Sequence, residues 1–280
     1  MQKICLFILA GLAAASFITN AAPNSEMIVV CYPGGSVNAK DANGAMTSML
    51  RVVERVGQWQ DKSFNSVFTS KSDECRKQMA DNKPKFAITS LGLFLDLRNQ
   101  HNLVPVVQPK IKGLTHERYR VMVQKGKYKN LDELKGKTLG GTALEESSFI
   151  GKIVFAGKYD PDTFFVLQKS NQAIRALRSL NKGELDAVIL NEQQFGGLSS
   201  LQMDTALEAV FTSEEIPLMG VVANSATTTE DERARFGKTL EGMCSDSEGK
   251  KLCELFGVEA FATVDSAVFD PMIKLLANGK

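Results

Sequence analysis

The sequence predicts an α/β protein of two lobes joined by two crossing strands, with a ligand cleft between the lobes. Short apolar runs alternate with longer amphipathic runs along most of the chain, an order typical of α/β proteins. The chain of 280 residues is long enough for one large domain or for two lobes of roughly 100–150 residues each. Two long predicted strands, residues 117–126 and 216–224, separate a middle block from both ends of the chain and favour two lobes.

The part of the chain before residue 117 predicts strands and helices in alternation. Apolar residues recur at helical spacing in residues 45–59, which predicts a helix. Near the start of the next predicted helix, the Ser72 hydroxyl is suited to act as the N-cap and to accept from a free backbone N–H. The predicted strands are residues 27–32, 65–69, 85–91 and 103–109, and the predicted helices are residues 45–59, 70–82 and 92–101.

The rest of the chain continues the same alternation. Side chains alternate along the long strand 117–126, and a short helix with a turn then leads to a strand that ends at Gly141. Two helices, residues 229–244 and 247–257, are predicted to close the chain. Between these parts the predicted strands are residues 162–168, 184–191, 207–213 and 216–224, with a helix at residues 171–183.

The two long strands define the predicted domain organisation. Residues 22–119 and 220–280 are expected to form one lobe, and residues 120–219 the other, after a signal peptide at residues 1–21. Strand ends and helix starts of both lobes then meet at the cleft, which is where open α/β folds bind their ligands.

The start of the chain has the features of a secretory signal peptide. Lys3 supplies a positive charge, residues 4–18 are apolar, and small residues follow at Thr19 and Ala21. The apolar run is shorter than the roughly 20 residues that a membrane-spanning helix needs. We therefore expect cleavage near Ala21 and a soluble protein in the periplasm.

Composition and motifs exclude several functions. Lys and Arg number 33 against 32 Asp and Glu, so no excess of positive charge favours nucleic acid. With only His101 and His116, a His-rich metal site is excluded, and neither a metal nor a cofactor is predicted. The sequence contains no Gly-x-Ser-x-Gly, HExxH or P-loop motif, so we do not expect an enzyme.

Four cysteines lie beyond the predicted signal peptide, and an oxidising compartment favours two disulfides among them. Three pairings are possible. Cys244 with Cys253 is favoured, because CSDSEGKKLC indicates a turn between two helices, and this leaves Cys31 with Cys75. The alternative is four buried free thiols.

Residues 140–152, GGTALEESSFIGK, predict a strand end, a Gly-rich turn and a helix start. Helix starts attract anions, because their first N–H groups are free and the positive end of the dipole lies there. Here Glu145 and Glu146 stand where an anion would bind. The alternative is that these carboxylates stabilise the helix start on a solvated face.

Several stretches resemble the type II periplasmic binding proteins, in the branch that includes the phosphonate-binding proteins. They are NLDELKGKTLGG, GGTALEESSFIGK, AIRALRSLNKGELDAVILN and KFAITSLGLFL. The resemblance implies a two-lobed periplasmic-binding-protein fold. It also implies phosphonate binding at the helix start, where the family has a Ser-Thr-Ser-Gly run. Ser147 and Ser148 match that run, but Phe149 replaces a small residue and the glutamates precede it.

Another resemblance is to the periplasmic sterol-binding components of bacterial sterol transport systems. In that family a Glu and a Tyr two residues apart, with an Asn from the other lobe, anchor the polar end of the sterol. Glu117 and Tyr119 match the pair on one face of a strand, and Asn191 ends a strand of the other lobe. Tyr32 and Phe149 are further candidates to line the cleft. The alternative for each residue is a structural role: an ion pair of Glu117, packing of Tyr119 and turn capping by Asn191.

These resemblances lead to two hypotheses about function. The first is a periplasmic binding protein that encloses an apolar, hydroxyl-bearing lipid, a sterol such as a 4-methylsterol, and carries it between the inner and outer membranes. Its partners would be an inner-membrane transporter and an outer-membrane-side protein, and the protein would be a monomer that binds no nucleic acid. The alternative is a binding protein for phosphonate- or phosphate-type anions that serves an ABC importer.

Overall fold

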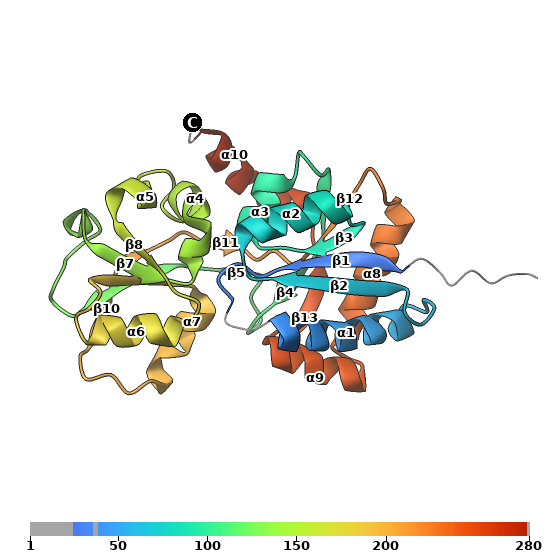
Figure 1. Ribbon diagram of the computed structural model, residues 1–280, viewed down its shortest axis with the longest axis horizontal. Helices are drawn as coiled ribbons and strands as arrows, with labels where there is room; N and C mark the ends of the chain where they lie inside the picture. Colours follow the sequence, from blue (N-terminus) through green and yellow to red (C-terminus); the bar gives the residue numbers. More distant parts are fainter. Residues whose placement is uncertain (1–24, 36–38, 279–280) are drawn as a thin grey trace, which may run out of the picture.

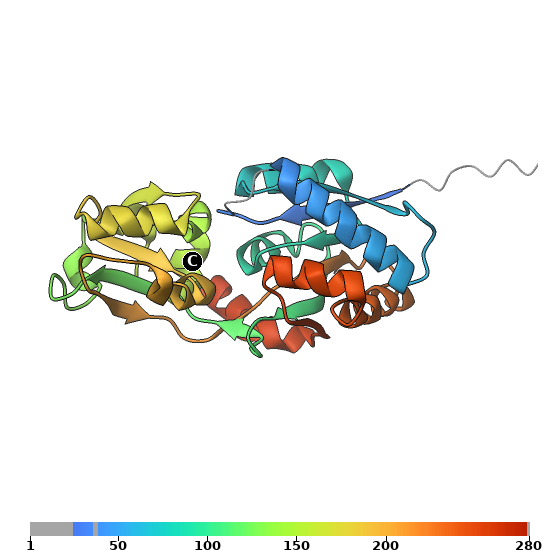
Figure 2. The ribbon, with the colours of Figure 1, turned by 90° about the horizontal axis from the view of Figure 1, so that it is seen from below.

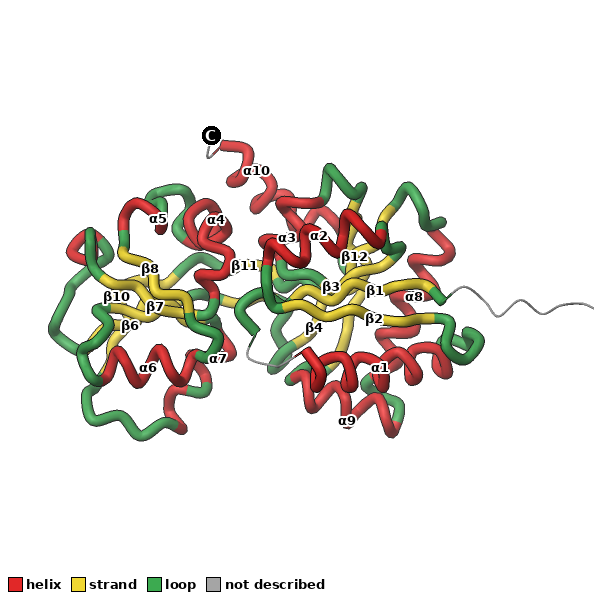
Figure 3. The backbone as a smooth tube through the Cα atoms, in the orientation of Figure 1, coloured by secondary structure: helices red, strands yellow, loops and turns green. Residues whose placement is uncertain are grey.

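Two β-sheets form the centres of two lobes, which lie side by side in Figure 1. The computed structural model describes residues 25–35 and 39–278, so the predicted signal peptide, residues 1–21, lies outside the described residues. Strands lie in the middle of each lobe and helices cover them (Figure 3). The predicted two-lobed α/β fold is confirmed. Within the described ranges, no helix is both long and apolar enough to cross a membrane.

Lobe 1 is built around a six-stranded sheet. Successive residues of its first strand face opposite sides of the sheet: Ile28 and Val30 belong to one apolar core, and Val29 and Cys31 to another. Its strands are β1 (Glu26–Cys31), β2 (Phe64–Thr69), β3 (Phe86–Ile88), β4 (Leu103–Lys110), β12 (Val221–Asn224) and β13 (Ala260–Thr263). Their order in the sheet is β13-β4-β12-β3-β1-β2.

Helices cover both faces of this sheet. They are α1 (Ala39–Val56), α2 (Ser72–Asn82), α3 (Leu91–Leu97), α8 (Glu230–Met243), α9 (Ser247–Phe256) and α10 (Asp270–Asn278). In Figure 1, α2 and α3 lie on one side of the sheet, and α1 and α9 on the other. A capping box in which Thr229 and Glu232 bond to each other's backbone N–H groups begins α8.

Lobe 2 is built around a five-stranded sheet. Its strands are β6 (Arg120–Gln124), β7 (Thr138–Gly141), β8 (Val166–Lys169), β9 (Ala187–Leu190) and β10 (Leu207–Thr212). The order in the sheet is β10-β6-β9-β7-β8, so β8 is an edge strand. Its helices are α4 (Ser147–Phe149), α5 (Pro161–Phe164), α6 (Ala173–Asn181) and α7 (Glu192–Gly196). A 3-10 turn at Ala143–Glu146 precedes α4, and a π-helical turn at Ile150–Val154 follows it.

The two connections between the lobes pair with each other. Strands β5 (His116–Glu117) and β11 (Ile216–Pro217) form a short antiparallel ladder between the two sheets. In Figure 2 the connecting segments run along the lower side of the molecule. The prediction of two long strands is therefore wrong in one respect, because each of them is interrupted. The first is divided into β5 and β6, and the second into β11 and β12. The lobe boundaries at residues 119/120 and 219/220 stay a prediction.

The end of the chain differs from the sequence prediction. Two closing helices were expected, but β13, a 3-10 turn at Ser266–Phe269 and α10 follow them. Helix α10 packs against α3 of lobe 1 and against the π-helical turn of lobe 2. Phe269 and Met272 consequently join an apolar core that runs through both lobes.

Both favoured disulfides are present in the structure. Cys31 at the end of β1 is bonded to Cys75 in α2, and Cys244 after α8 is bonded to Cys253 in α9. Each bond ties a helix to its neighbouring element within lobe 1.

Candidate functional site

Glu145 of lobe 2 reaches across to the start of helix α2 in lobe 1. Its carboxylate accepts from the Ser72 backbone N–H at 3.3 Å and lies 3.6 Å from Lys71 Nζ. Ser72 was expected to cap this helix, but it is the first helical residue, and the described N-cap residue, Lys71, makes no side-chain capping hydrogen bond. A carboxylate from the opposite lobe therefore complements the free N–H groups and the positive end of the α2 dipole.

Glu146 contacts the start of helix α3 through the side chain that caps this helix. Its carboxylate accepts from Ser90 Oγ at 2.9 Å, and Ser90 is the N-cap residue of α3. Gly92 allows this approach, because a Cβ at that position would collide with the Glu146 carboxylate and lie 3.0 Å from Phe149 Cβ. Burial raises the pKa of Glu146 to about 7, against the hydrogen bond from Ser90.

The two glutamates of lobe 2 thus bond to the starts of two helices of lobe 1. Ser147 donates to Asp162 Oδ2 at 2.8 Å, and Ser148 is exposed to solvent. Phe149 packs edge-on against the Tyr119 ring at a centroid distance of 5.9 Å. Of residues 140–152, Glu145 alone lines the pocket that lies between the lobes.

Glu117 and Tyr119 lie together at the connection between the lobes. The Tyr119 hydroxyl donates to Glu117 Oε1 at 3.1 Å. Burial raises the pKa of Glu117 to about 7, although Tyr119 and the backbone N–H of Glu192 bond to the carboxylate. Tyr32 is 54 % exposed, and desolvation, followed by the charge of Glu117, raises the pKa of its hydroxyl.

Asn191 is near this cluster but its side chain is used in capping. It accepts from the Gln194 backbone N–H at 3.0 Å and forms a capping box at the start of α7. Its neighbour Glu192, rather than Asn191 itself, provides the contact with Glu117. The structure therefore brings Glu117, Tyr119, Tyr32 and Phe149 together, while Asn191 acts as a helix cap.

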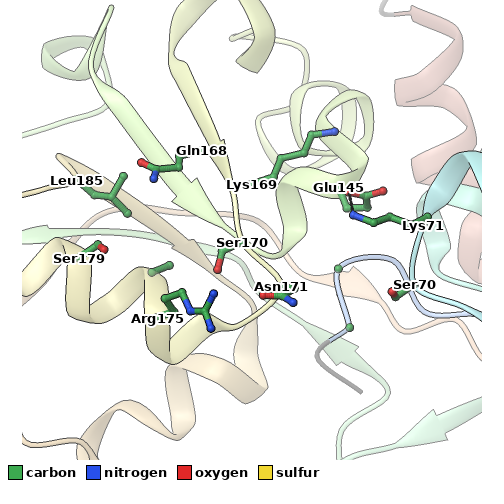
Figure 4. Close-up of a pocket in the computed structure, with 13 residues that line it drawn as sticks. Ser70, Lys71, Glu145, Gln168, Lys169, Ser170, Asn171, Arg175, Ser179 and Leu185 are labelled. Atoms are coloured by element: carbon green, nitrogen blue, oxygen red, sulfur yellow. Dashed lines mark ion pairs between the residues drawn. The ribbon is translucent and has the colours of Figure 1, made fainter. Parts of the chain in front are cut away.

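A pocket of about 570 Å³ lies between the two lobes, and the Lys71–Glu145 pair forms part of its lining. At the edge of the pocket, Gly34 of lobe 1 lies close to lobe 2. A Cβ at this position would collide with the Thr142 carbonyl. Figure 4 shows Lys71 reaching from lobe 1 toward Glu145 of lobe 2. The lining comes from Gly34, Gly35, Ser70 and Lys71 of lobe 1 and from Glu145, residues 168–171, Arg175, Ala176, Ser179 and Leu185 of lobe 2.

The pocket carries more positive than negative charge. Lys71, Lys169 and Arg175 line it against a single acid, Glu145, which is paired with Lys71. Lys169 ends β8 and Arg175 lies in the first turn of α6, and neither forms an ion pair within the described residues. The N-cap residue of α6, Gln172, makes no side-chain capping hydrogen bond in the described part of the chain. Such an arrangement suits an anion with several acceptor oxygens.

Comparison with protein families gives the family of this chain. The family model described as "ABC transporter, phosphonate, periplasmic substrate-binding protein" matches residues 38–269. The chain belongs to this family. No curated protein matches the sequence. Members of the phosphonate-binding family are substrate-binding components of transporters rather than enzymes, which implies a small-molecule ligand and a membrane transporter as partner.

Solved structures of the same fold include further phosphonate-related proteins. A binding protein component of an ABC phosphonate transporter from Pseudomonas aeruginosa has a TM-score of 0.69 at 15% identity, over 91% of this chain and 87% of that chain. PhnD1 from Prochlorococcus marinus, in complex with methylphosphonate, has a TM-score of 0.66 at 13% identity, over 90% and 98% of the two chains. A Xanthomonas citri protein bound to ATP has a TM-score of 0.66 at 11% identity, over 91% and 97%. At these identities the likeness establishes the fold alone.

Sequence reasoning on this phosphonate-binding-family chain missed the basic residues of the pocket. Lys71, Lys169 and Arg175 were not among the predicted site residues, because the serines of the helix start, and not these residues, match the binding run of the family. A signal was present in KSNQAIR, residues 169–175, where a strand end, a polar turn and a helix start carry two basic residues. The contribution of Lys71 from the other lobe depends on how the lobes meet and leaves no local pattern.

Proposed function

We propose that this protein is the substrate-binding component of an ABC importer for small phosphoryl-bearing anions, of which phosphonates are the first class to test. The observation that carries the proposal is the pocket between the lobes, in which Lys169 and Arg175 have no anionic partner among the described residues. Two proteins of the same fold were solved with phosphoryl compounds, methylphosphonate in one and ATP in the other. The basic residues of the pocket and the compounds bound by these two proteins both favour a phosphoryl-bearing ligand.

Binding at this pocket would also favour contact between the lobes. An anion held by Arg175 of lobe 2 would attract Lys71 of lobe 1 across the pocket. A ligand that interacts with both lobes shifts the population toward the arrangement in which both contacts form. A transporter could then distinguish the loaded protein from the empty one by its shape.

Titration calorimetry with methylphosphonate and inorganic phosphate tests the proposal. We expect binding by the native protein and a loss of about tenfold or more in affinity for Arg175→Gln, since a charge-assisted contact is removed. Arg178→Gln is the matched control, because Arg178 lies on the same helix, is exposed and does not line the pocket. Failure of both compounds to bind, or equal affinity of the two variants, would contradict the proposal.

A sterol-type lipid is the second candidate ligand, favoured by the cluster of Glu117, Tyr119, Tyr32 and Phe149. It ranks below the anion for a physical reason. The Tyr119 hydroxyl already donates to Glu117, and Asn191 caps α7, so the groups that would anchor a sterol hydroxyl satisfy one another. Among the described residues that line the pocket, only Ala176 and Leu185 have apolar side chains. The outer-membrane-side partner belongs to this candidate alone, and tight binding of a 4-methylsterol without phosphonate binding would reverse the ranking.

A further inference from the structure

The pocket is large compared with a simple phosphonate. Its volume is about 570 Å³, within the roughly 300–1,000 Å³ typical of sites for drug-sized ligands. At about 30 Å³ for each water molecule, the space corresponds to about twenty water-sized volumes. Methylphosphonate, with its single methyl group, would fill only a small part of it.

The two ends of the pocket differ in charge. Lys71 and Glu145 lie at one end, and Gln168, Ser179 and Leu185 at the other, with Arg175 and Asn171 between them (Figure 4). The neutral end offers an amide and a hydroxyl. The Ser179 hydroxyl donates to Glu184 at 2.8 Å and keeps its lone pairs as acceptors, while the Gln168 amide has both donors and an acceptor.

Stacking surfaces are missing from this pocket. Of the described residues that line it, none is aromatic. Binding sites for nucleobases commonly use aromatic side chains on which the base stacks. The lining is therefore better suited to a hydroxylated body than to a flat heterocycle.

We propose that the ligand is a phosphorylated sugar or polyol, with its phosphoryl group at Arg175 and its hydroxyl groups toward Gln168 and Ser179, which lie on the same side of β8 as Arg175 (Figure 4). The inference rests on the proposed function, because it assumes that the pocket binds a phosphoryl group. It adds that the organic part of the ligand fills the neutral end of the pocket and supplies selectivity. A polyol hydroxyl can both donate to and accept from the groups at that end.

Calorimetric titrations of the purified protein with glucose 6-phosphate, glucose, AMP and methylphosphonate test the inference. We expect glucose 6-phosphate to bind at least about tenfold more tightly than each of the other three compounds, which corresponds to about 1.4 kcal/mol. Gln168→Ala should lower the affinity for glucose 6-phosphate by about 3- to 10-fold, and by more than it lowers that for methylphosphonate. Arg178→Gln again serves as the control outside the pocket.

The outcomes separate the inference from the function on which it rests. If methylphosphonate binds as tightly as glucose 6-phosphate, the pocket still takes phosphoryl anions but the sugar-phosphate inference is overturned. Equal or tighter binding of AMP overturns it as well, since a nucleoside would then be accepted without a stacking surface. If no phosphoryl compound binds, both the inference and the proposed function fail.

Discussion

The Glu146 carboxylate of lobe 2 accepts a hydrogen bond of 2.9 Å from Ser90 Oγ, the N-cap residue of helix α3 in lobe 1. Glu145 accepts from the Ser72 backbone N–H at the start of α2, so both glutamates contact helix starts of lobe 1. The two acidic residues thus connect lobe 2 to lobe 1.

The first prediction concerns the pH dependence of stability. Burial raises the pKa of Glu146 to about 7 from 4.5, with Ser90 and Arg76 opposing the shift and Asp96 and Glu145 adding to it. A raised carboxyl pKa means that the stabilisation is complete below about pH 4.5 and is lost as the pH rises through about 7. The melting temperature should therefore fall between about pH 5.5 and about pH 8, by an amount equivalent to at most about 2 kcal/mol for this group.

Glu146→Gln tests the origin of this slope. The amide keeps an acceptor for Ser90 without the charge, so the variant should be more stable than the native protein at about pH 8 and should lose part of the slope. Glu117 has a similar pKa and should keep the remainder of the slope. Glu254→Gln, at an exposed position, is the control and should leave the slope as it is. An unchanged slope in Glu146→Gln would contradict the assignment.

The second prediction concerns the close approach at Gly92. Gly92→Ala would force the Glu146 carboxylate to move and would press on Phe149 Cβ, 3.0 Å away. We expect a net destabilisation of about 1 kcal/mol, because overpacking outweighs the better helix propensity of Ala. Gly44→Ala in α1 is the matched control, since nothing lies within 4 Å of its Cβ position, and it should stabilise by about 0.5–1 kcal/mol. Urea unfolding measures both, and stabilisation by Gly92→Ala would refute the close approach.

These contacts also show where sequence reasoning succeeds and where it stops. Strand β1 was predicted well, because Ile28 and Val30 face one core and Val29 and Cys31 the other. These four successive residues are therefore all apolar. The long strands were predicted without their interruptions. Gly220 lies at one of them, where a Cβ would be 2.8 Å from the Val107 carbonyl, and such a contact with a distant strand leaves no local pattern.

The site was harder to predict than the fold. Glu117 and Tyr119 were found because they stand two residues apart, and they do contact each other. The partners of Glu145 and Glu146 are Ser72 and Ser90, which lie more than fifty residues away in sequence. Their meeting depends on the arrangement of two lobes, which alternation of apolar residues does not encode.

The third prediction compares the two disulfides. Cys31 and Cys75 are 44 residues apart in sequence, whereas Cys244 and Cys253 are 9 apart. In the chain-entropy account, the bond that closes the longer loop restricts the unfolded chain more, by about 4 kcal/mol against about 2.5 kcal/mol. Replacing Cys31 and Cys75 by Ala should therefore cost more free energy of unfolding than replacing the other pair. Chemical denaturation of the two double variants measures this, and the reverse order would contradict the prediction.

The last prediction uses two tyrosines that donate to carboxylates with opposite pKa shifts. Tyr119 donates to Glu117, whose pKa burial raises to about 7, so this carboxylate is largely protonated at about pH 5 and largely ionised at about pH 8. Tyr128 donates to Asp186, where burial opposes ionisation but hydrogen bonds from Tyr128 and Thr138 lower the pKa to about 2. Asp186 is therefore ionised at both pH values.

Tyr119→Phe should consequently destabilise the protein more at about pH 8 than at about pH 5. At the higher pH the lost bond is charge-assisted, worth about 1.5–3 kcal/mol, and at the lower pH it is a neutral bond of about 1 kcal/mol. Tyr128→Phe is the matched control, with the same chemical change and a loss that is equal at both pH values. Urea unfolding at the two pH values measures all four losses. Equal losses for Tyr119→Phe would mean that Glu117 keeps one charge state across this range and that its burial does not control its ionisation.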